Sequence, residues 1–128
     1  MGLRRALTQN RAFTDPDDDD PRMRGRSYAI PFVQVWEAAH EIARGTPGWT
    51  IVGSDWNAGE IVAVATGLWK STDDVWVRLS LDQDGQTCVE MTSASRGERG
   101  DLGTNARRIA RFLRTLDARL LESRNANR

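Results

Sequence analysis

The chain has 128 residues, a length that suits one domain with one hydrophobic core. Its 18 basic and 18 acidic residues balance, so no overall charge points to nucleic acid or to an anionic membrane as a partner. The single cysteine, Cys88, excludes an internal disulfide and a zinc site built from several cysteines.

Four consecutive aspartates, Asp17–Asp20, dominate the polar N-terminal segment. A calcium or magnesium loop needs carboxylates that alternate with turn residues, whereas a contiguous acidic run repels itself and stays solvated. We therefore expect residues 1–27 to form a largely disordered arm, and we expect no metal and no cofactor. The sequence shows no membrane-spanning run and no apolar run typical of a secretion signal, which predicts a soluble cytoplasmic protein.

Two amphipathic segments predict helices. In residues 31–45 apolar side chains recur at spacings of three and four, and glycines and a proline follow. A longer segment, residues 102–120, repeats the pattern with arginines beside its apolar line. The only histidine, His40, lies beside the first apolar stripe, where a structural or solvated role is the ordinary interpretation.

Between the helices the pattern favours strands at residues 49–52, 59–67, 73–81 and 87–94. The second of these is apolar on both faces, as expected for a strand covered on each side or one whose outer face meets a partner. The element order predicts an α+β fold, a two-layer sandwich with a four-stranded antiparallel meander and both helices on one face. The single domain would span residues 28–122, and residues 123–128 would form a frayed tail.

The connection between the last two strands allows two registers. A two-residue turn ending at Gly85 would set Leu79 opposite the carboxylate of Glu90. A three-residue loop with Gly85 in the left-handed conformation sets Leu79 opposite Val89 instead. Matched cross-strand pairs contribute about 0.2–1 kcal/mol each, and a slip of one residue turns every side chain to the wrong face, so we predict the three-residue loop. The same register pairs Val77 with Met91, and Arg78 with Glu90 as an ion pair.

Polar residues gather where the last strand ends and the last helix begins. In the predicted register Asp73 lies opposite Ser95 on the core side, and Asp74 lies on the outer side, diagonal to Arg96. Asp101 is placed to cap the helix by accepting from its first backbone N–H groups. The candidate site is therefore Asp73, Asp74, Ser93, Ser95, Arg96, Asp101, Asn105, Arg107 and Arg108.

Three segments, PGWTIV, DDVWVR and above all SASRGERGDLGTNARRI, are similar to a family of bacteria and plastids known as domain of unknown function 1499. The similarity covers roughly residues 28–120. The resemblance implies a fold unit more than a reaction, because the family has no established activity. The positions that it carries over are Ser93, Ser95, Arg96, Asp101, Leu102, Gly103, Asn105, Arg107 and Arg108.

Two interpretations of the polar corner do not involve catalysis. In the first the corner only organises the fold: Asp73 anchors an arginine and Asn105 ties down the loop. In the second the corner is an anion or small-ligand site, where Arg96, Arg99 and Arg107 join the helix N-terminus in holding a phosphate or carboxylate.

A third interpretation is a hydrolase in which Asp73 is the base, Ser93 or Ser95 the nucleophile and Arg96 the stabiliser of negative charge. No histidine or lysine is predicted beside a serine, so the sequence favours a protein that is not an enzyme. A fourth possibility is a homodimer or a protein partner at a tryptophan-bearing sheet face. That face would carry Trp56, Trp69 and Trp76.

Overall fold

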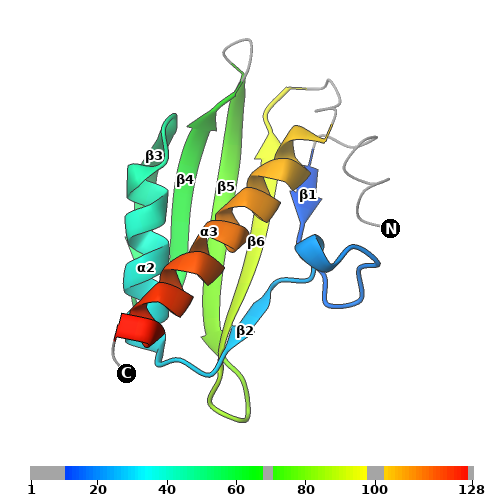
Figure 1. The fold of residues 1–128 in the computed structure, drawn as a ribbon. Helices are drawn as coiled ribbons and strands as arrows, with labels where there is room; N and C mark the ends of the chain where they lie inside the picture. The colour runs from blue at the N-terminus through cyan, green and yellow to red at the C-terminus, as the bar shows by residue number, and fades with distance from the viewer. Residues whose placement is uncertain (1–10, 68–70, 98–102, 127–128) are drawn as a thin grey trace.

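The structure, a computed structural model, describes residues 11–67, 71–97 and 103–126. Two α-helices, α2 (Phe32–Gly45) and α3 (Thr104–Ala126), and a short 3-10 helix, η1 (Pro21–Met23), accompany one sheet (Figure 1). The strands are β1 (Arg11–Phe13), β2 (Arg26–Tyr28), β3 (Trp49–Asp55), β4 (Glu60–Thr66), β5 (Thr72–Leu81) and β6 (Thr87–Ser95). All pairings are antiparallel in the order β1-β6-β5-β4-β3, and β2 also pairs with β6.

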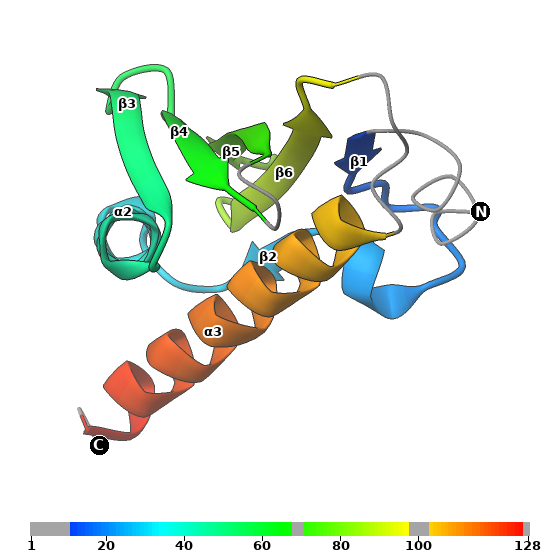
Figure 2. The same ribbon diagram turned by 90° about the horizontal axis from the view of Figure 1, so that it is seen from above.

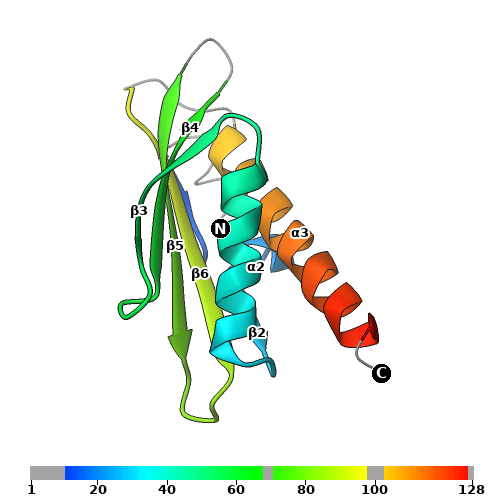
Figure 3. The same ribbon diagram turned by 90° about the vertical axis from the view of Figure 1, so that its left-hand side faces the viewer.

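The molecule has two layers, with α2 and α3 on the same face of the sheet (Figures 2 and 3). The predicted α+β class and the placement of both helices are confirmed. Alternation along β5 buries Val75 and Val77, which join Ile109 and Leu113 of α3 in the core. The opposite face of the sheet, which we call the outer face, carries neither helix. Neither α2 nor α3 has the length and apolar character needed to cross a bilayer.

The β5-β6 hairpin has the predicted register. Leu79 pairs with Val89 and Val77 with Met91. Gly85 has a φ of 79°, the left-handed conformation that closes a three-residue loop.

The ion pair predicted within this hairpin is wrong, although its register is right. Arg78 lies opposite Glu90, yet its guanidinium donates to Glu60 at 2.9 Å. Glu60 lies opposite Arg78 on the other neighbouring strand, β4, and the carboxylate of Glu90 accepts instead from the Thr14 hydroxyl. A hairpin considered alone does not show which of two acids competes better for an arginine between them.

The N-terminal segment departs from the expected disordered arm. β1 pairs with one end of β6 and β2 with its other end, so the backbone groups that β6 would otherwise expose as a sheet edge are bonded. Ala12 and Met23 enter the core at 3% and 2% exposure. Within the acidic run, Asp20 caps η1 by accepting from the Arg22 N–H at 2.9 Å. Residues 1–10 lie outside the described residues.

The C-terminal helix also differs from expectation. α3 continues to Ala126. Residues 123–126, which we expected to fray, are therefore helical.

Candidate functional site

A buried polar cluster, Asp73, Ser93, Asn105 and Arg108, lies where β5, β6 and α3 meet. The Arg108 Nη1 atom lies 2.7 Å from Asp73 Oδ2, and the side chains of Arg108 and Asp73 are 10% and 2% exposed. Strand alternation turns Asp73 and Ser93 toward the helices, and the three-residue spacing of Asn105 and Arg108 places both on one side of α3. Two strands and one helix therefore bring these four polar side chains into contact with one another.

Asn105 is the centre of this cluster and is fully buried. Its Oδ1 accepts from the Ser93 hydroxyl at 2.6 Å and from Arg108 Nη1 at 2.8 Å. Its Nδ2 donates to the Ser95 hydroxyl at 3.0 Å. These bonds tie the end of β6 to the first turn of α3.

One acceptor in the cluster is unsatisfied. Oδ1 of Asp73 is buried and accepts no hydrogen bond from the described residues. Gly67 lies against the same ion pair: a Cβ there would stand 3.5 Å from Asp73 Oδ2 and 2.6 Å from the Ser71 hydroxyl. A larger residue at position 67 would push into the side chains that enclose Asp73.

The cluster does not have the geometry of a serine hydrolase. Ser93 is fully buried, and its hydroxyl donates to an amide oxygen rather than to a base. His40 lies on α2 with its ring beside Trp36 at 6.2 Å between centroids. No group of three or more potential metal ligands occurs within residues 11–67, 71–97 and 103–126.

Of the other predicted site residues, Ser95 contacts the buried cluster through Asn105, whereas Asp74, Arg96 and Arg107 lie apart from it. Asp74 and Arg96 form an ion pair at 2.8 Å on the outer face, and this hydrogen bond raises the pKa of the Arg96 guanidinium. Arg107 is exposed and donates to the Thr104 hydroxyl at 3.4 Å. Asp101, with its predicted helix cap, and Arg99 lie outside the described residues.

A feature that sequence reasoning missed is a groove of about 750 Å³ between α2 and α3, which we call the basic groove. Four arginines of α3 line it: Arg107, Arg108, Arg111 and Arg119. Trp49 and Phe112 also line it, with their rings parallel within 2° and their centroids 5.5 Å apart. The groove thus joins cationic and aromatic surface.

Charge in the basic groove is mostly positive. Glu41 is the acidic residue among the described side chains that line it, and its carboxylate pairs with Arg119 at 3.0 Å. Arg108 is neutralised by Asp73. Arg111 is exposed, and its guanidinium has no ion pair or hydrogen bond with any described residue. The sequence shows arginines beside the apolar line of α3, but only the packing of α2 against it makes them one wall of a groove.

The tryptophans do not form the single patch that the sequence suggested. Trp56 lies in the β3-β4 turn and packs edge-on against Phe32 and Trp36, at centroid distances of 5.2 and 5.5 Å, so it belongs to the α2 side. Trp76 lies on the outer face and is 43% exposed. Trp69 lies outside the described residues.

Comparison with known proteins gives a family. A search of curated proteins found no match to this sequence. A family model described as protein of unknown function (DUF1499) matches residues 3–116, which is most of the chain. The chain therefore belongs to this family.

Proposed function

We propose that this protein is a binding module and that its ligand is a small molecule with an anionic group and an apolar or aromatic body, held in the basic groove. The observation that carries the proposal is the groove itself, which has four arginines of α3 on one wall and Trp49, stacked on Phe112, beside them. Its volume of about 750 Å³ is that of a small-molecule site.

The arginines support an anionic ligand. Arg107 and Arg111 are four residues apart and so are neighbours on one side of α3. Arg111 has no carboxylate partner among the described residues, so its planar guanidinium is free to donate two parallel hydrogen bonds to a carboxylate, phosphate or sulfonate. The one acid that lines the described groove, Glu41, is paired with Arg119 and repels an anion less than a free carboxylate would.

The rest of the lining supports an apolar body on the same ligand. Trp49, half-buried and stacked on the buried ring of Phe112, presents an aromatic surface, and Pro47 adds exposed aliphatic surface from the turn after α2. Burying apolar area contributes affinity in proportion to the area removed from water. A free inorganic anion would use only the arginines, so the groove favours an organic anion.

The buried polar cluster supports this site and shares one residue, Arg108, with it. The Asp73 carboxylate and the Asn105 amide hold Arg108 in place, and the same bonds fix the first two turns of α3, which carry Arg107 and Arg111. In this proposal the corner predicted from the sequence is the structural base of a neighbouring groove.

A fluorescent aromatic sulfonate, anilinonaphthalene sulfonate, tests the proposal because it has both chemical parts. We expect its emission to rise on binding, and we expect Arg111→Gln to weaken binding by about tenfold, the loss typical of one charge-assisted hydrogen bond. Added salt should weaken binding to the wild type more than to the variant.

The matched control for this titration is Arg114→Gln. Arg114 is exposed on the same helix but does not line the groove, so its loss changes net charge equally and should leave affinity unchanged. Equal affinities for wild type and Arg111→Gln would refute the proposal.

A further inference from the structure

The outer face of the sheet carries apolar surface that neither helix covers. The register sets Val62 opposite Trp76, Trp76 opposite Thr92, and Thr92 opposite Phe13, which makes one row across four strands. Trp76 is 43% exposed and Val52 on β3 is 61% exposed. Strand β4 is apolar on both of its faces although only one faces the core, a pattern that is unusual for a strand with one wet face.

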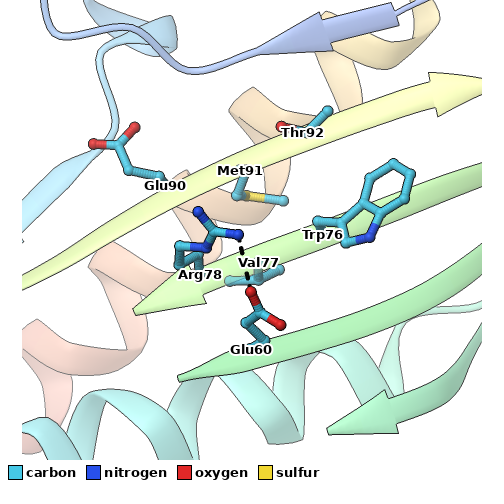
Figure 4. A pocket seen from close by; sticks show the side chains of 7 residues that line it. All are labelled: Glu60, Trp76, Val77, Arg78, Glu90, Met91 and Thr92. Carbon is cyan, nitrogen blue, oxygen red and sulfur yellow. Dashed lines mark hydrogen bonds and ion pairs between the residues drawn. The ribbon is translucent and has the colours of Figure 1, made fainter. Parts of the chain in front are cut away.

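Beside this row lies a hollow of about 340 Å³, lined by Glu60, Trp76, Arg78, Glu90 and Thr92 (Figure 4). Arg78 donates to Glu60 across the hollow, and its side chain is 69% exposed. Trp76 and Arg78 are two residues apart on β5 and therefore about 7 Å apart on the same face. An exposed indole and a charged hollow that it helps to line thus occur together on one surface.

We propose that a second copy of this chain docks face to face on the outer face, with Trp76 of each copy in the hollow of the other. In a two-fold interface both copies use the same surface, so each residue must contact a chemically complementary residue of that same surface on the second copy. A partner of another kind would not need the indole and its hollow to occur together. Their pairing on one strand is the reason to assign this face to a second copy.

The register fixes which residues meet. A two-fold axis that crosses the strands at the level of Val77 places Trp76 of one copy over Arg78 of the second copy, and Arg78 over Trp76. On the neighbouring strand the same axis places Thr92 over Glu90 of the second copy. On β4 it places Val62 over Glu60.

Two of these three kinds of pair are chemically favourable. An exposed guanidinium over the face of an indole is a cation–π contact, and Glu60 keeps that guanidinium oriented. The Thr92 hydroxyl can donate to the carboxylate of Glu90. The strands β3 to β6 are 7 to 10 residues long. Five strand positions about 4.8 Å apart therefore give a footprint of about 20 by 27 Å, so two copies bury about 1,100 Å² in total, above the roughly 1,000 Å² that a specific interface needs.

Sedimentation equilibrium of the full chain, run from micromolar to several hundred micromolar, tests this inference. We expect wild type to form a dimer, and we expect Trp76→Ala to raise the dimer dissociation constant at least tenfold, as loss of a central aromatic anchor does. Arg78→Ala should raise it as well, because it removes the other half of the same contact. Thermal unfolding of each variant checks that the fold persists, which the exposure of both side chains predicts.

Trp56→Ala is the matched control. Trp56 is 46% exposed, close to the value for Trp76, but packs on the α2 side, so its loss should leave the dimer intact. A wild-type protein that stays monomeric over the whole range of protein concentrations overturns the inference, even if a different partner covers Trp76. So does a Trp76→Ala variant that dimerises as wild type does.

Discussion

Asp73 and Asp74 are neighbours in the sequence and point to opposite faces of β5. Asp73 is 1% exposed and pairs with Arg108, which is itself nearly buried. Asp74 pairs with Arg96 on the outer face, where that arginine side chain is 55% exposed. Two identical side chains with similar partners therefore differ in one variable, access to water, and this variable governs what an ion pair contributes to stability.

Substitution of the two aspartates separates these environments. Asp73→Asn keeps the shape of the side chain but leaves the charge of Arg108 buried without compensation, which costs about 3–5 kcal/mol of unfolding free energy. Asp74→Asn should cost only a small fraction of that, because water and salt already screen the exposed pair. Denaturant unfolding curves measure both. Similar small losses for the two variants would contradict the assignment of Asp73 to a structural cluster.

At the scale of elements, Asp117 of α3 joins the N-terminal strand β2 to the helix layer. Its carboxylate accepts from Arg26 Nε at 2.9 Å and from the Tyr28 hydroxyl at 2.5 Å. Burial raises the pKa of the Tyr28 phenol, and the hydrogen bond to Asp117 raises it further. β2 is only three residues long, so these two side-chain bonds are a large part of what holds it.

Alkaline titration tests this connection, and Tyr28 is the only tyrosine, so tyrosinate absorbance reports it alone. We expect no ionisation in the folded protein near pH 10, the usual pKa of tyrosine. Since the pKa is raised by folding, stability is unaffected below about pH 10 and falls as pH rises above it, when the unfolded chain ionises first.

The control for this titration is Tyr28→Phe. The variant should lose this alkaline step in stability while keeping its other pH dependence. Tyrosinate that forms in the folded wild type with a midpoint of about 10 would show that the contact with Asp117 is absent.

The β5-β6 hairpin was predictable because its information is local. Alternation identifies the inner faces, and Gly85 supplies the positive φ that fixes the loop. The strands β1 and β2 were not predictable, because three residues are too few to show the two-residue period of a strand. These segments are strands because they pair with the open edge of β6, which lies far from them in the sequence. The partner of Arg78 was missed for the same reason, since it belongs to a strand that the hairpin does not contain.

In the candidate site too, features set by local sequence could be predicted and features set by tertiary packing could not. The pairing of Asp73 with the start of α3 could be inferred, since register and helix position together place it, and Arg108 lies there. The basic groove could not be inferred, because it exists only where α2 packs beside α3, and no local pattern specifies the angle between two helices.

At the scale of the whole molecule, the sheet separates two surfaces with different chemistry. The helix side holds the basic groove, and the outer face holds Trp76 with its hollow. The two proposals are therefore independent, since a side chain on one side of the sheet does not contact a ligand on the other. Trp76→Ala should leave the affinity for the aromatic sulfonate unchanged, and Arg111→Gln should leave the dimer unchanged.

The most direct measurement of the central claim, that the basic groove binds an organic anion, is amide chemical-shift mapping during titration with anilinonaphthalene sulfonate. The groove predicts shifts that saturate together at Thr46, Thr104 and Arg111, with outer-face amides such as those of Trp76 and Thr92 unmoved. Shifts that concentrate on the outer face, or groove amides that stay still while the probe binds, would contradict the account.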